Sequence, residues 1–346
     1  MLDALGLDLP IIQAPMAGVS TPALAAAVSR AGALGSISVG ATDAAGARKM
    51  ILEVRSRTHR SFNVNVFVHQ AAQRRPEREA AWLAALAPTF RRFNAEPLST
   101  LNVIYKSFAE DDELLRVLVE LKPPVVSFHF GLPKAEQVRS LKQVECLLFA
   151  TVTNLDEAEA AAKSGIDAVV GQGWEAGGHR GIFDPDASDD RLGTFPLTRL
   201  LAKRSRLPVI AAGGIMDGQG IGAALKLGAT AAQLGTAFIA CPESSADDGY
   251  RAALLSPAAE HTTMTRAISG RPARCLANAF TRLGAEVVLT PPDYPIAYDA
   301  GKALNAAALA CGESGYGAQW AGQGAPLARS LPAADLVAVL ASELQA

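Results

Sequence analysis

The chain has 346 residues, 49% of them hydrophobic and 19% charged, which is enough for a large core in one α/β domain. The formal net charge is −2 without a block of lysine or arginine, which argues against nucleic-acid and membrane-surface partners. Four scattered cysteines without a CxxC pair argue against a disulfide framework or zinc site. Neither a signal peptide nor a bilayer-spanning apolar run is evident, so the sequence predicts a cytoplasmic protein.

Short apolar runs alternate with helical patterns along the first two thirds of the chain. Glycine, proline and polar residues bound these runs, which is typical of buried strands in α/β proteins. In chain order the patterns predict a strand from residue 9, a helix over 22–30, a strand at 34–39, a helix over 44–58, a strand at 62–68, helices over 76–93 and 111–121, strands at 125–131 and 146–152, a helix ending near 164, strands at 166–171 and 207–215, a helix ending near 228, and a strand at 231–238.

Three helix starts carry capping signals. Thr21 is the expected N-cap of the first long helix, and Pro22 occupies its first position. Asn154 or Asp156 caps the helix after the fifth strand, and Asp217 caps the helix after the seventh. A polar side chain at each place can accept from N–H groups that the helix leaves unpaired.

Polar side chains occur on two of the predicted strands. Asn63 and Asn65 occupy alternate positions of the third strand, so their side chains share one face. Buried amides need partners, which predicts either a ligand or a polar network. His129 lies at the end of the fourth strand, where the sequence leaves a packed structural histidine and a site residue equally open.

Eight strands that alternate with helices predict a parallel sheet with crossover helices. Eight repeats favour closure into a TIM (β/α)8 barrel, and an open doubly wound sheet is the alternative. In such barrels the active site is built from the loops that follow the strands. Glycines and polar residues follow several of the predicted strands here.

The alternation stops at about residue 242. We expect the barrel to comprise residues 1–241 and 318–346, and a small helical cap to comprise 242–317. The tail predicts a closing helix, with Ser330 as its N-cap and Pro332 in its first turn.

A glycine-rich stretch, 171–181, follows the sixth strand. Five of its eleven residues are glycine, which suits a backbone that bends sharply or approaches a ligand closely. His179 lies within it, and its imidazole could act as a base or as a hydrogen-bond donor. A surface turn with a solvated histidine is the alternative. Glu175 could pair with a cation, cap the loop or act as an acid.

The remaining titratable residues give weaker signals. His59, His69 and His261 do not have metal-ligand spacing with the other histidines, so we predict no metal. The cysteines suit core packing.

Two consecutive strand ends carry glycine turns that lead into helices. Gly213, Gly214 and Ile215 follow the seventh strand, and Gly235 and Thr236 follow the eighth. Backbone N–H groups at such turns favour an anion, and this is the usual phosphate site of TIM barrels. We therefore predict a phosphate-bearing ligand, with two ordinary glycine turns as the alternative.

Several motifs, in this order, resemble those of the nitronate monooxygenase family, formerly called 2-nitropropane dioxygenases. They are residues 13–18 (QAPMAG), 63–65 (NVN), 173–179 (GWEAGGH), 211–215 (AAGGI) and 233–236 (QLGT). The resemblance covers nearly the whole chain. The histidine motif is shared with FMN-dependent enoyl-ACP reductases, whereas residues 294–302 and 319–324 resemble the bacterial class I nitronate monooxygenases in particular.

This resemblance implies a TIM barrel that binds FMN non-covalently, with the cap closing over the flavin. The implied cofactor-binding residues are Met16, Asn65, Gln172, Gly177, Gly178, Gly213, Gly214, Gln233, Gly235 and Thr236, the last two at the phosphate. His179 is implied as the histidine of the catalytic site. The other implied catalytic residues, which line the substrate pocket, are Tyr105, His129, Tyr298 and Lys302.

The implied reaction is oxidation of an alkyl nitronate, with propionate 3-nitronate as the expected substrate, by the flavin and O2. Its products are a carbonyl compound and nitrite or nitrate, which is a detoxifying reaction. Because a nitronate is an anion, Lys302, a protonated His179 and tyrosine hydroxyls would attract it. If a neutral nitroalkane is also used, His179 is the group expected to remove its α-proton.

Two rival functions remain at this stage. One is an FMN- and NAD(P)H-dependent reductase, similar to an enoyl-ACP reductase or a quinone reductase, although no basic docking patch is evident. The other is a flavin-storing or ligand-sensing barrel without turnover. The sequence also leaves open a monomer or a homodimer, the use of NAD(P)H, the physiological nitronate and its pathway, and the orientation of Arg180.

Overall fold

A closed barrel of eight parallel strands forms the centre of the computed structural model, which describes residues 1–346. The strands are β1 (Ile11–Gln13), β2 (Gly35–Ser38), β3 (Phe62–Phe67), β4 (Val125–His129), β5 (Leu147–Val152), β6 (Ala168–Gln172), β8 (Val209–Ala212) and β9 (Ala231–Leu234). Their order is β1-β9-β8-β6-β5-β4-β3-β2. The Leu34 N–H donates to Ile11 and the Gln13 N–H to Leu34, both at 2.9 Å, which joins β1 to β2. The predicted TIM barrel is confirmed, and the open sheet is excluded.

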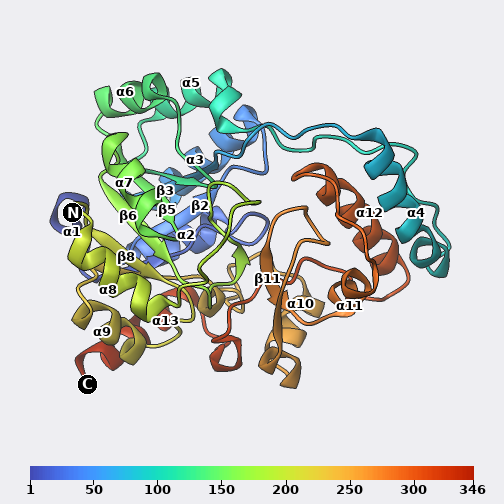
Figure 1. The fold of residues 1–346 in the computed structure, drawn as a ribbon. Coiled ribbons are helices and arrows are strands. Elements are labelled where there is room, and N and C mark those ends of the chain that lie inside the picture. The colour runs from blue at the N-terminus through green and yellow to red at the C-terminus, as the bar shows by residue number, and fades with distance from the viewer.

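Helices surround the barrel and make its strands almost fully buried (Figure 1). Strands that are covered on both faces need near-continuous apolar runs, and these runs made each barrel strand predictable from the sequence. The surrounding helices are α2 (Pro22–Arg30), α3 (Ala44–Arg57), α5 (Asp112–Leu121), α6 (Ala135–Gln143), α7 (Leu155–Lys163), α8 (Thr194–Arg204), α9 (Gly218–Lys226) and α13 (Ala333–Gln345). None of the helices has the length and apolar character needed to cross a membrane.

The amino-terminal end of the barrel is closed by a short helix, α1 (Leu2–Leu5). Leu5 is buried in one apolar cluster with Ile12, Phe149 and Ile210 from the strands. This end is therefore a packed core, and only the opposite end can open to a ligand.

The predicted caps of the internal helices are confirmed. The side chain of Thr21 accepts from the Leu24 N–H at the start of α2. Asn154, rather than Asp156, caps α7, and Asp217 caps α9. Each cap satisfies a donor that would otherwise lack a partner.

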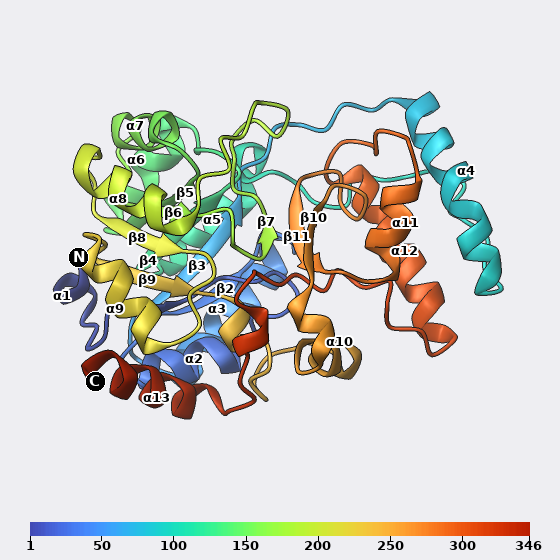
Figure 2. The same cartoon turned by 60° about the horizontal axis from the view of Figure 1, so that its bottom comes forward.

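The predicted cap of the closing helix is wrong. Pro332, not Ser330, is the N-cap of α13, and it provides no side-chain acceptor. The carboxylate of Glu243 accepts from the Ala333 N–H instead, at 3.1 Å to each oxygen. α13 then packs against α9 and α2, beneath the barrel in Figure 2.

The cap region contains a small sheet as well as the expected helices α10 (Asp248–Leu254), α11 (Ala279–Glu286) and α12 (Ile296–Ala310). β10 (Thr262–Thr265) and β11 (Ala273–Leu276) pair antiparallel. The other edge of β11 pairs with β7 (Gly178–His179), which belongs to the glycine-rich stretch (Figure 2). Strands of two and four residues are too short to give a sequence pattern, so the sequence did not predict this sheet.

One long helix outside the cap segment packs with the cap. Trp82 and Phe90 of α4 (Pro76–Arg92) share an apolar cluster with Phe280 and Leu304. In Figure 1 α4 lies beyond α12, away from the barrel. The division of the chain at residues 242 and 317 stays a prediction, and we propose that α4 belongs with the cap.

The role of Glu243 can be tested through stability. Replacing Glu243 with alanine removes the acceptor at the start of α13 and a favourable charge at that helix N-terminus. We expect the free energy of unfolding, measured by urea denaturation, to fall by about 1 kcal/mol. The matched control is Glu159→Ala on the exposed face of α7, where no capping contact is lost. Equal effects of the two substitutions would contradict the capping role.

Candidate functional site

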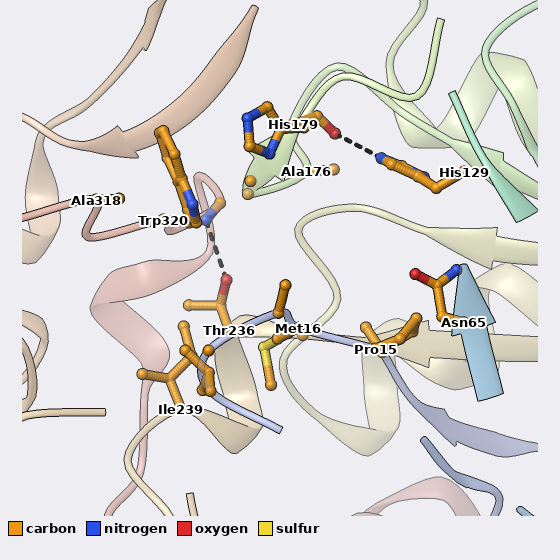
Figure 3. Close-up of a pocket in the computed structure, with 18 of the residues that line it drawn as sticks. Pro15, Met16, Asn65, His129, Ala176, His179, Thr236, Ile239, Ala318 and Trp320 are labelled. Atoms are coloured by element: carbon orange, nitrogen blue, oxygen red, sulfur yellow. Dashed lines mark hydrogen bonds between the residues drawn. The ribbon is translucent and has the colours of Figure 1, made fainter. Parts of the chain in front are cut away.

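A cavity of about 460 Å³ opens at the carboxyl ends of the barrel strands, beneath the cap. Every residue that the sequence predicted for the site lines this cavity. Figure 3 labels Met16, Asn65, His129, His179 and Thr236 among them. From the barrel these are Met16, Asn65, His129, Gln172, Gly177, Gly178, His179, Gly213, Gly214, Gln233, Gly235 and Thr236. Tyr105 comes from the long connection after α4, and Tyr298 and Lys302 come from α12. The fold thus brings together residues that lie up to 286 positions apart, from Met16 to Lys302.

The asparagines of β3 belong to a polar network inside the barrel. The Asn65 amide donates to the Ser127 hydroxyl at 3.0 Å and accepts from the Ser38 hydroxyl at 3.2 Å. Asn63 donates to Ser36 at 3.2 Å. Of the two explanations that the sequence left open, a polar network is therefore present, and Asn65 also faces the cavity.

The strand ends at β8 and β9 present unpaired backbone donors. The N–H groups of Gly213, Gly214, Ile215 and Gly235 donate to no acceptor within the protein. Gly213 and Gly214 have φ of 124° and 69°, which glycine adopts readily and other residues rarely. Free N–H groups gathered at one rim of a cavity form a site for an anion such as a phosphate.

The glycine-rich stretch folds back over the barrel mouth through its own side chains. Gln172 accepts from the Gly181 N–H at 2.7 Å and donates to the His179 carbonyl at 2.9 Å. A Cβ on Gly177 would lie 2.4 Å from the Gly322 nitrogen, so only glycine permits this approach. These contacts fix the main chain of His179 independently of the contacts that its ring makes.

The ring of His179 is held between the cap and the barrel. Its Nε2 lies 2.8 Å from the Ser269 hydroxyl, and its ring packs 5.0 Å from Trp320 and 5.4 Å from Tyr294 between centroids. Burial lowers the pKa of His179 well below its usual value, and the nearby His129 and Arg271 lower it further. In the free protein His179 is therefore neutral, and the protonated His179 expected to attract a nitronate stays a prediction for the substrate-bound site.

His129 supports His179 from the barrel side. Its Nε2 donates to the His179 carbonyl at 3.2 Å (Figure 3). Burial lowers the pKa of His129 to about 4. The hydrogen bond to the His179 carbonyl opposes this effect, and the charges of Arg271 and Arg180 lower the pKa further. His129 is thus a neutral donor that both lines the cavity and positions the neighbouring histidine.

Tyrosines and one lysine form the cap side of the cavity. The Lys302 Nζ lies 5.5 Å from the ring centroids of both Tyr105 and Tyr298. Burial raises the pKa of each of these two phenols to about 12, so both keep their hydroxyl proton at neutral pH. Lys302 makes no salt bridge within the protein. An unpaired ammonium beside phenolic donors is suited to an anionic ligand.

Two residues whose roles the sequence left open face away from the cavity. The Glu175 carboxylate accepts from the Thr194 N–H at 2.7 Å and from its hydroxyl at 3.0 Å, so it caps α8. Arg180 forms a bidentate pair with Asp189 at 2.7 and 3.0 Å. Neither side chain can reach a ligand in the cavity.

Three residues around His179 were not among the predicted site residues. Tyr294 and Trp320 lie within the segments that carried the resemblance, 294–302 and 319–324, so the signal was present but was not assigned to them. Ser269 lies in a connection without any motif. Only the folded chain places its hydroxyl against the imidazole.

The comparisons with known proteins agree with one another. The chain matches the family model described as nitronate monooxygenase over residues 1–343. A nitronate monooxygenase from Paraburkholderia phytofirmans is 63% identical over 346 residues, covering 100% of this chain and 94% of that protein. One from Pseudomonas aeruginosa is 55% identical over 342 residues, covering 99% and 97%.

Two solved structures also resemble the chain closely. A nitroalkane oxidase from Streptomyces ansochromogenes has a TM-score of 0.90 at 40% identity, covering 100% of this chain and 98% of that one. FabK from Thermotoga maritima has a TM-score of 0.75 at 30% identity, covering 99% and 94%.

The neutral His129 predicts a loss of stability in acid. Between pH 6.5 and about 4 the unfolded chain binds a proton at this histidine and the folded protein does not, so the free energy of unfolding falls as the pH falls. We expect His129 to account for a loss on the order of 3 kcal/mol over this interval.

Urea denaturation at several pH values between 7 and 4 measures this loss. In His129→Gln the fall over this interval should be smaller than in the wild type by that amount. His59→Gln, at an exposed position, serves as the control and should follow the wild type. A variant at position 129 that loses as much stability as the wild type would contradict the assignment.

Proposed function

The chain belongs to the nitronate monooxygenase family, and we propose that it oxidises alkyl nitronates with FMN and O2 to a carbonyl compound and nitrite or nitrate. The observation that carries this proposal is a single cavity with an anion-binding rim on one side and an unpaired lysine on the other. The anion-binding rim suits the phosphate of the cofactor, and the unpaired lysine suits an anionic substrate.

The barrel side of the cavity fits FMN. The free N–H groups after β8 and β9 can receive the phosphate, and the amides of Gln172 and Gln233 line the same space. We propose that the cofactor-binding residues are those named from the resemblance, from Met16 to Thr236. When bound, FMN supplies the transfer of electrons to O2 that side chains cannot provide.

The cap side of the cavity fits a small anion. We propose that Lys302 attracts the nitronate, and that the hydroxyls of Tyr105 and Tyr298 donate hydrogen bonds to its oxygens. Propionate 3-nitronate is the proposed substrate, because it carries a carboxylate as well as the nitronate and so gains most from an unpaired cation. His179, being neutral, contributes shape and a hydrogen-bonding nitrogen rather than charge.

A purified sample tests the proposal directly. We expect a yellow protein whose visible spectrum is that of oxidised flavin, and which consumes O2 and releases nitrite when propionate 3-nitronate is added. A parallel sample receives NADH, because the histidine motif that resembles FMN-dependent enoyl-ACP reductases keeps a reductase as the second candidate. Bleaching by NADH with no response to the nitronate would favour the reductase, and a colourless protein that FMN cannot reconstitute would contradict both.

The role of Lys302 predicts a change in substrate binding. Lys302→Met removes the charge and keeps the length of the side chain, so we expect KM for propionate 3-nitronate to rise roughly 10-fold to 100-fold with a smaller change in kcat. Steady-state oxygen consumption measures both constants. Lys226→Met, on the exposed surface of α9, is the control and should leave KM unchanged. An unchanged KM in the Lys302 variant would show that the cation does not bind the substrate.

A further inference from the structure

Ser269 is a fully buried hydroxyl that lies directly behind the imidazole of His179. Its exposed fraction is 0%, and its Oγ is 2.8 Å from His179 Nε2. The same Oγ lies 3.3 Å from the carbonyl oxygen and 3.4 Å from the nitrogen of Arg271. It makes no other polar contact, so the hydroxyl links the ring of His179 to the backbone of one residue, Arg271.

The number of hydrogens decides which group donates. A serine hydroxyl has one hydrogen, and the Arg271 carbonyl has no other donor within the protein. If the hydroxyl donated to His179, this carbonyl would be left unpaired in a residue that is only 3% exposed. If the hydroxyl donates to the carbonyl, the ring N–H of His179 donates to Oγ and every group is satisfied. The second arrangement avoids the cost of a buried unpaired acceptor.

The other ring nitrogen of His179 then becomes the acceptor. A neutral imidazole carries one hydrogen, so a hydrogen on Nε2 leaves a lone pair on Nδ1. Nδ1 has no partner within the protein and is not among the buried unpaired atoms, and the ring lines the cavity. Gln172 and His129 both hold the His179 carbonyl and so fix the main chain, while Ser269, Trp320 and Tyr294 contact the ring itself.

We propose that Ser269 is a positioning residue that fixes His179 in its Nε2–H tautomer, so that Nδ1 acts as the base for neutral nitroalkanes. The assignment of this substrate rests on the proposed function, whereas the tautomer does not. In the step, the α-C–H bond breaks, its electron pair passes into the nitro group to form the nitronate, and the proton moves to Nδ1.

Ser269 transfers no proton in this step. Its Oγ accepts from Nε2–H before and after the transfer, so it stabilises the imidazolium as it forms. In the free protein burial disfavours the charged form of His179 by lowering its pKa, and His129 and Arg271 lower the pKa further. The nitronate formed next to the ring supplies the missing counter-charge, so the substrate itself makes the proton transfer more favourable.

The tautomer can be measured without any substrate. In purified protein labelled with ¹⁵N-histidine, the His179 signals are assigned by their loss in His179→Gln. We expect a protonated Nε2 and an unprotonated Nδ1 in the wild type, and a mixture of tautomers in Ser269→Ala. Ser29→Ala, which removes an equally buried hydroxyl that accepts from the Gly35 N–H at 3.1 Å, should leave the His179 signals unchanged. A wild type protonated at Nδ1, or an unchanged pattern in Ser269→Ala, would overturn the proposal.

Kinetics separate a positioning role from a merely structural one. We expect Ser269→Ala to lower kcat for nitroethane roughly 10-fold to 100-fold, and kcat for preformed ethyl nitronate by no more than about 2-fold. Ser269→Thr restores the hydroxyl and should recover the tautomer pattern. Equal losses with both substrates would overturn the base-positioning role. A wild type that oxidises neither compound would contradict the proposed function, while the NMR result still decides whether Ser269 fixes the tautomer.

Discussion

The pairing of β7 with β11 is the contact on which the site depends. Ala273 pairs with His179 and Arg274 with Gly178, so a loop of the barrel becomes the edge strand of a sheet in the cap. The same edge of β11 is bridged one residue later to Trp320, through Cys275. The short strand β11 therefore sets the spacing of His179 and Trp320, and its pairing with β7 holds the cap against the barrel mouth.

This arrangement explains the distribution of charge in the cavity. Burial without a counter-ion keeps both histidines neutral, and the guanidinium of Arg271, which lies 4.3 Å from the ring centroid of Phe130, disfavours a second positive charge. Lys302, from the cap, is left as an unpaired cation in the cavity that the free N–H groups of the barrel also line. The barrel and the cap thus each contribute a group to the cavity that can receive an anion.

The sequence predicted the parts of the molecule that local physics determines. Buried strands have apolar runs, Thr21 and Asp217 lie at the starts of the helices they cap, and the two glycines after β8 adopt conformations that other residues avoid. It could not predict contacts made across the chain. Glu243 caps a helix that begins 90 residues later, and Ser269 meets a histidine 90 residues earlier. The low pKa of His179 in the free protein could not be predicted for the same reason, because it depends on its burial and on which groups the fold places around the ring.

The geometry also explains how one histidine could serve two forms of a substrate. A protonated imidazole would bind an anion strongly but could not remove a proton, and a neutral imidazole with its lone pair turned away could do neither. With Nε2–H directed to Ser269, the lone pair faces the cavity and the attraction of anions is left to Lys302 and the phenols. Separating the base from the cation in this way lets the cavity hold a nitronate without first protonating the histidine, and lets the same histidine generate the nitronate from its neutral acid.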